Sequence, residues 1–152
     1  MDLFSAMSIS ASGLDAQRTR MNTISSNLAN AQSTRTEEGG AYRRRDVVFT
    51  AQPAFNPQPA GAPFAAALGS AMGRGVSEVR VSEIVEDDRP AREVYSPGHP
   101  DADEKGIVRY PNVSVIEEMV NMIAATRSYE ANVTAMSAAK GLINHPIDHT
   151  QA

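Results

Sequence analysis

The feature that most constrains the fold is a pair of apolar stripes at heptad spacing, one near each end of the chain. A repeat of seven is typical of helices that pack along a seam. We therefore predict two long helices, each of which uses the other to bury its stripe. The N-terminal stripe consists of Met7, Leu14, Met21 and Leu28, and the C-terminal one of Val115, Met122, Tyr129, Met136 and Ile143.

Each stripe has a second, weaker row. In the N-terminal helix, Leu3, Ile24 and Ala31 lie on this row, and Ser10 and Gln17 dilute it. A helix-interior glycine, Gly13, costs about 1 kcal/mol relative to alanine, so this helix needs a partner to be stable. The C-terminal second row is Met119, Thr126 and Val133, and Ile116, Val120 and Ile123 widen the apolar face. A face this wide can contact more than one neighbour.

Capping signals give the limits of the second helix. Ser114 and Glu117 form an S-x-x-E capping box, and the sequence Asn144-His145-Pro146 predicts the helix end. We expect an N-terminal helical segment over residues 1–35, a C-terminal one over 112–145 and a tail over 146–152.

Between the helices, residues 36–111 change character. The stretches GGAYRRRDVVFT, VSEVRVSEIV and GIVRYP contain β-prone residues next to Gly or Pro, and the first begins with a glycine pair suited to a turn. An Ala, Pro and Gly mixture at about 51–75 predicts a flexible loop with a short helical turn at 64–68. The fold class is therefore mainly α with a small β-rich insert.

The direction of pairing follows from the connection. The insert leaves the first helix near Asn30 and enters the second near Ser114. A compact insert joins these ends directly if the helices are antiparallel, whereas a parallel pair needs an extended return of roughly 40 Å. We therefore expect an antiparallel, coiled-coil-like hairpin.

Composition excludes several functional classes. The net charge of −4 gives no basic field for nucleic acid, and we interpret Arg43–Arg45 as a solvated surface. The absence of cysteine excludes disulfides and thiolate chemistry. No stretch reaches the roughly 18 apolar residues of a membrane span, and the first residues do not form a conventional cleavable signal peptide.

Candidate metal and catalytic groups are weak. His145 and His149 have helical metal-ligand spacing, but Pro146 lies between them. The stretch DADEKG resembles the opening of a calcium loop, yet Lys105 occupies a ligand position, so we interpret it as a polar turn. Adjacent Glu117 and Glu118 point about 100° apart on a helix and are assigned no chemistry. We predict no catalysis, metal or cofactor.

Both ends of the chain resemble a known family. The stretches SGLDAQRTRMNTISSNLANAQSTRTEEGGAYRRR, SPGHPDADEKGIVRYPNV and VIEEMVNMIAATRSYEANVTAM are similar to those of flagellar rod and hook axial proteins. The resemblance covers roughly residues 5–50 and 94–143. The SSNLAN element is shared across that family, whereas GHPDADEKG, YPNVSVIEEMVNMI and the short chain indicate a proximal rod member.

This resemblance implies a structural subunit of the periplasm-spanning rod in the bacterial flagellar basal body, exported by the flagellar type III apparatus without a cleaved signal peptide. Implied partners are other copies of itself, the rod proteins FlgB, FlgF and FlgG, and the rod-base protein FliE. No nucleic acid and no membrane insertion are implied. Two alternatives are another axial subunit of the rod family and a helical adaptor protein.

The candidate assembly interface combines the stripes with two asparagines. Asn27 and Asn30 lie on one face and can hydrogen-bond freed carbonyls at a helix end or a neighbouring subunit. The residues alone favour a cap and turn, and the resemblance favours a subunit contact. The expected interface residues are Met7, Leu14, Met21, Ile24, Asn27, Leu28, Asn30, Val115, Met119, Met122, Ile123, Tyr129, Val133 and Met136.

Overall fold

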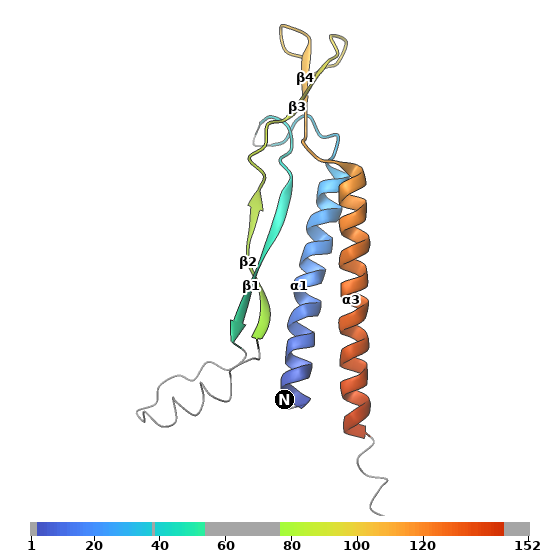
Figure 1. The fold of residues 1–152 in the computed structure, drawn as a ribbon. Helices are drawn as coiled ribbons and strands as arrows, with labels where there is room; N and C mark the ends of the chain where they lie inside the picture. The colour runs from blue at the N-terminus through green and yellow to red at the C-terminus, as the bar shows by residue number, and fades with distance from the viewer. Residues whose placement is uncertain (1–2, 38, 54–76, 145–152) are drawn as a thin grey trace, which may run out of the picture. The chain divides into compact units, whose positions relative to one another are not determined.

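The computed structural model describes residues 3–37, 39–53 and 77–144, and these ranges contain two long helices and two strand pairs (Figure 1). Helix α1 spans Leu3–Ala29, and helix α3 spans Val115–Asn144. These elements confirm a mainly helical chain with a small strand-bearing middle. The strands are β1 (Arg45–Pro53), β2 (Ser77–Glu86), β3 (Arg92–Tyr95) and β4 (Ile107–Tyr110).

Local hydrogen bonds explain where the helices begin and end. The last turn of α1 is closed at Asn30, whose backbone N–H donates to the carbonyl of Ser26 at 3.0 Å. Helix α3 begins after Ser114, whose hydroxyl accepts a long hydrogen bond of 3.4 Å from the N–H of Glu117. Ser114 is therefore the N-cap of α3, as the capping box predicted.

The strands form two separate two-stranded sheets. Strand β1 pairs with β2, and β3 pairs antiparallel with β4, with Val94 opposite Val108. The sequence predicted β1, β2 and β4. It did not predict β3, which begins with the charged residues Arg92 and Glu93, whereas the equally short β4 begins with the apolar Ile107 and Val108. Pairing with β4 stabilises β3, and Val108 is fully buried there.

Two predicted turns are present. Gly39 and Gly40 have φ values of 89° and 85°, a conformation that glycine adopts without strain. In the DADEKG stretch, the Asp103 carboxylate accepts the N–H groups of Lys105 and Ile107, each at 2.9 Å. Gly106 follows with a φ of 74°. The polar-turn interpretation of DADEKG is therefore confirmed.

The chain divides into two compact units, through both of which the helices pass. The first comprises residues 1–18, 49–82 and 127–152. In this unit, the Ser8 hydroxyl donates to the Glu78 carboxylate, and the Val79 N–H donates to the Ser12 hydroxyl at 3.2 Å. A Cβ on Gly13 would lie 2.9 Å from the Asn132 side-chain nitrogen, so glycine here permits close approach of α3.

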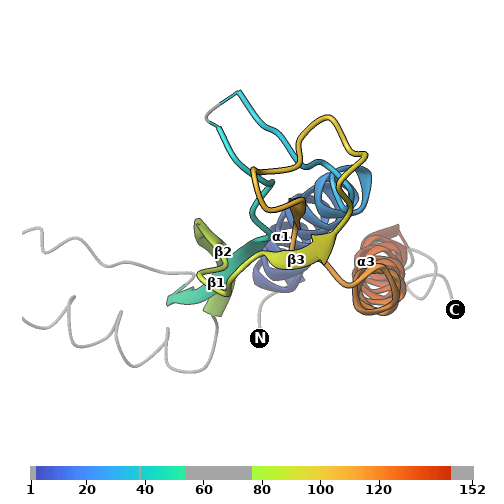
Figure 2. The same cartoon turned by 90° about the horizontal axis from the view of Figure 1, so that it is seen from above.

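The second unit comprises residues 19–48 and 83–126. It contains the end of α1, the beginning of α3 and the β3–β4 pair. Figure 2 shows α1, α3 and β3 from above. The Thr126 hydroxyl of α3 donates to the Met21 sulfur of α1 at 3.7 Å. The Thr34 hydroxyl donates to Asp101 at 2.7 Å and thereby ties the segment after α1 to the loop after β3.

Several expectations fall on parts of the chain that the structure leaves undescribed. Strand β1 includes the first three residues of the predicted loop at 51–75, and the rest of that loop, with its helical turn at 64–68, lies outside the described residues. The tail at 146–152, His145 and His149 also lie outside them. Within the described ranges, neither helix is long and apolar enough to cross a membrane, and no three metal-ligating side chains form a cluster.

Candidate assembly interface

The expected interface residues of α1 face the interior to different degrees. Ile24 and Asn27 are buried, and the other five are half-buried: Met7, Leu14, Met21, Leu28 and Asn30. Ala16 and Thr23 are also buried, although neither belongs to the predicted stripe. The buried face of α1 is therefore formed partly by small side chains.

The expected interface residues of α3 separate into two groups. Met122, Tyr129 and Met136 are half-buried, whereas Val115, Met119, Ile123 and Val133 are exposed. Ile116 and Val120 are exposed as well, at 77% and 61%. Five of these residues form a continuous patch over the first turns of α3, which we call the outer stripe: Val115, Ile116, Met119, Val120 and Ile123.

The buried row of α3 is one residue away from the predicted second row. Glu118, Ala125 and Ala139 are buried, at heptad spacing or its multiple, while Met119 and Thr126 are exposed. In the row that starts at Val115, the first residue is exposed, and Met122, Tyr129 and Met136 are half-buried.

Asn27 is the centre of a buried polar cluster in the second unit. Its side-chain nitrogen donates to the Arg45 carbonyl at 2.8 Å and to Glu118 Oε2 at 3.1 Å. Its oxygen accepts the Arg45 N–H at 2.9 Å and the Tyr42 hydroxyl at 3.0 Å. All four hydrogen-bonding positions of the amide are thus used within the chain. Asn27 therefore bonds both backbone groups of Arg45, the first residue of β1, as a residue of a neighbouring strand would.

Glu118 and Arg44 complete the polar cluster, which we define as Asn27, Tyr42, Arg44, Arg45 and Glu118. The Arg44 Nε donates to Glu118 Oε1 at 2.8 Å, and its NH1 donates to Asp46 at 3.1 Å. Burial alone would lower the pKa of Arg44, but hydrogen bonds to Asp46 and Glu118 raise it above its usual value. Arg44 is therefore a permanent cation beside a carboxylate that is only 1% exposed.

The interpretation of Arg43–Arg45 as solvated surface is wrong for Arg44. The side chains alternate as the chain enters β1, so Arg43 and Arg45 are exposed while Arg44 points inward. Arg45 pairs with Glu86 at 3.1 Å on the outside. Two features of the sequence indicate the ion pair. One is this alternation, and the other is Glu118 in the same heptad row of α3 as Ala125 and Ala139.

Asn30 serves the end of α1. Its side-chain nitrogen donates to the Ser26 carbonyl at 3.0 Å, and its oxygen accepts the Ser33 hydroxyl at 3.1 Å. It therefore satisfies a freed carbonyl at the helix end, one of the two roles expected for it. Asn27 on α1 and Asn30 directly after it lie three residues apart and have different local partners.

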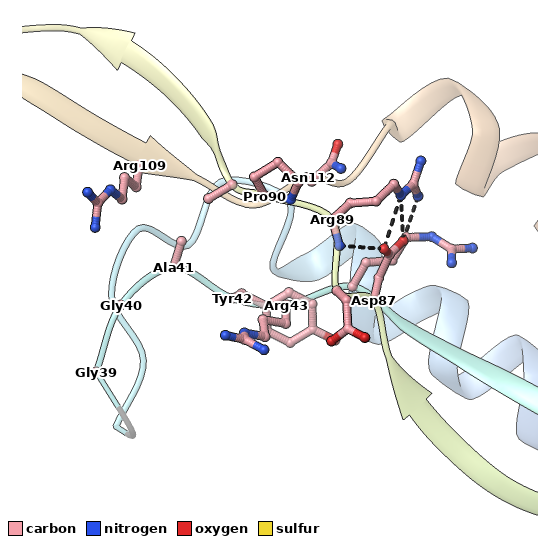
Figure 3. A pocket seen from close by; sticks show the side chains of 13 residues that line it. Gly39, Gly40, Ala41, Tyr42, Arg43, Asp87, Arg89, Pro90, Arg109 and Asn112 are labelled. Atoms are coloured by element: carbon pink, nitrogen blue, oxygen red, sulfur yellow. Dashed lines mark hydrogen bonds and ion pairs between the residues drawn. The ribbon is translucent and has the colours of Figure 1, made fainter.

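A pocket of about 250 Å³ lies next to the polar cluster and is lined in part by the glycine turn, Arg43, Arg109 and Asn112 (Figure 3). One of its two acidic residues, Asp87, accepts hydrogen bonds from the guanidinium and the backbone N–H of Arg89, the shortest being 2.6 Å. These bonds lower the pKa of Asp87 from 3.8 to about 2. A carboxylate that stays ionised and paired is not suited to general acid–base catalysis near neutral pH.

Long terminal helices that expose an apolar stripe are typical of a protein that assembles with others. Residues 7–35 match a family described as "Flagella basal body rod protein", and residues 104–144 match "Flagellar basal body rod FlgEFG protein C-terminal". The chain is 43% identical over 150 residues to the flagellar basal-body rod protein FlgC of Bacillus subtilis, covering 94% of this chain and 95% of that protein. It is 42% identical over 146 residues to FlgC of Borreliella burgdorferi, covering 93% of each. The chain belongs to the FlgC family of flagellar basal-body rod proteins.

Proposed function

We propose that this protein is a structural subunit of the bacterial flagellar basal-body rod, without catalytic activity. The observation that carries this proposal is the similarity to FlgC proteins along nearly the whole chain. The exposed outer stripe supports a role in assembly, whereas the saturated hydrogen bonds of Asn27 stabilise the single chain. In this proposal, residues 1–35 and 112–145 are the axial segments, and 36–111 are the insert.

The two helices form an antiparallel hairpin in this proposal. Contacts within the two units support the direction of pairing, because residue numbers fall along α1 as they rise along α3. Asn27 bonds to Glu118, Met21 contacts Thr126, and Gly13 lies against Asn132. The buried alanines of α3, Ala125 and Ala139, allow close approach of the helices.

Assembly then uses two kinds of contact. The half-buried residues of the expected interface stabilise the hairpin, and the exposed ones, Val115, Met119, Ile123 and Val133, contact neighbouring subunits. The neighbours are further copies of the chain, the rod proteins FlgB, FlgF and FlgG, and the rod-base protein FliE. The chain reaches the rod through the flagellar type III export apparatus.

The rod assignment predicts that a tagged copy is incorporated into basal bodies. Detergent-extracted basal bodies from a strain whose own gene is replaced by the tagged one should carry the label along the rod, and the strain should remain motile. Electron microscopy with labelled antibody measures this. A tagged protein found only in small soluble complexes would instead favour an adaptor.

The antiparallel hairpin predicts a specific crosslink. Because the chain has no cysteine, Met7→Cys and Met136→Cys introduce the only two thiols. In an antiparallel pair these thiols lie near the same end, so oxidation of assembled rods should link them within one chain. The Met7→Cys and Met119→Cys pair is the control and should stay unlinked. Preferential linkage of the control pair, after links between chains are separated by mass, would exclude the antiparallel arrangement.

A further inference from the structure

We propose that the polar cluster makes the packing of α3 on α1 conditional on the docking of the insert, so that the helices close only when Arg44 and the start of β1 are in place. Glu118 is the group that creates this condition. Its side chain is 1% exposed, and its two oxygens have partners from different segments. Oε2 accepts from Asn27 of α1, and Oε1 accepts from Arg44 of the insert.

The charge balance explains why the helices alone are insufficient. Helix α1 offers Glu118 only a neutral amide, from Asn27. The nearest buried residue in the same heptad row of α3 is Ala125, which has no polar group. A buried carboxylate without a cation is strongly unfavourable, whereas the same carboxylate with a hydrogen-bonded guanidinium is tolerated. The insert therefore supplies the positive charge that allows Glu118 to be buried.

The two charges are not equivalent. Arg44 has a second carboxylate partner, Asp46, which is itself half exposed, and the Arg44 side chain remains 15% exposed. Loss of Glu118 leaves Arg44 paired and partly hydrated. Loss of Arg44 leaves Glu118 buried beside an amide. Removing the cation should consequently be far more harmful than removing the anion, whereas a simple mutual attraction predicts equal losses from the two substitutions.

The same arrangement fixes the relative position of the helices. Asn27 must lie level with Glu118 for the amide to reach both the carboxylate and the Arg45 backbone. A slip of one turn would place Met122 opposite Asn27 and would leave both amide and carboxylate without these partners. A single buried polar group can specify register in this way.

A single buried thiol measures the opening of the helix contact. Ala125→Cys introduces the only cysteine of the chain at a fully buried position of α3. The ratio of its labelling rates in urea and in buffer gives a protection factor for the purified full chain. In this background, Arg44→Met should lower the protection at least about 100-fold. Glu118→Leu should change it less than about 5-fold.

The double variant gives the decisive comparison. Arg44→Met together with Glu118→Leu removes the buried charge with its partner, so protection should return to within about 10-fold of the Ala125→Cys parent. Arg43→Met, which removes an exposed arginine one residue away, is the matched control and should leave protection unchanged. The proposal is overturned if Arg44→Met behaves like Arg43→Met, if the double variant opens as readily as Arg44→Met alone, or if the introduced thiol is unprotected in the Ala125→Cys parent itself.

Discussion

An Asn27→Asp variant is expected to lose about 3 kcal/mol or more of its free energy of unfolding, although the two side chains have the same shape. The substitution replaces the donating nitrogen by an accepting oxygen. That oxygen would face Glu118 Oε2 at 3.1 Å and the Arg45 carbonyl at 2.8 Å, so two hydrogen bonds become repulsive contacts inside a buried site. Urea unfolding of the purified chain, followed by circular dichroism, measures the loss. This loss is large, because the whole free energy of unfolding of a small domain is only about 5 to 15 kcal/mol.

Asn22→Asp is the matched control for this substitution. It makes the same change in charge on the same helix, but Asn22 is exposed, so its effect should stay within about 0.5 kcal/mol. If both variants unfold at the same urea concentration, the polar cluster does not stabilise the fold in the way its geometry indicates.

The sequence predicted the long elements because each has many repeats of its period. Helices α1 and α3 cover 27 and 30 residues, enough for a seven-residue pattern to recur several times. Strands β1 and β2 were also predicted, because each is a β-prone run of about ten residues. Strand β3 was not predicted, because two of its four residues are charged and its pairing with β4 is not contained in a local pattern.

The site was predicted less completely, and the reason is chemical. A heptad stripe is recognised by its large apolar residues, and in this chain these residues form both the outer stripe and the edge of the buried row of α3. The seam of α3 is made of Glu118, Ala125 and Ala139, which carry little hydrophobic signal. The burial of Glu118 depends on its ion pair with Arg44. Arg44 is 74 residues away in the chain, so no local spacing connects the two residues.

The outer stripe presents a surface whose chemistry favours coverage by another protein. Its five side chains are between 47% and 77% exposed and occupy consecutive turns of α3. Isolated apolar side chains are normal on a protein surface, but a contiguous patch is typical of an interaction site. Because these residues are already exposed in the single chain, substituting them separates assembly from folding. Substitutions at Asn27 or Arg44 cannot separate assembly from folding, because both residues also stabilise the single chain.

An Ile123→Asp variant is therefore expected to fold normally and to fail in assembly. At 54% exposure the new carboxylate stays hydrated in the single chain, so the urea midpoint should change little. In an assembled rod the same carboxylate would be buried at a subunit contact at a cost of several kcal/mol, which corresponds to a loss of at least about 100-fold in incorporation. Counting labelled basal bodies in a strain that carries only the variant measures this. Ala135→Asp adds the same charge at an exposed position about 120° around α3 and should retain incorporation. If Ile123→Asp still builds rods and supports motility, the outer stripe is not an assembly contact.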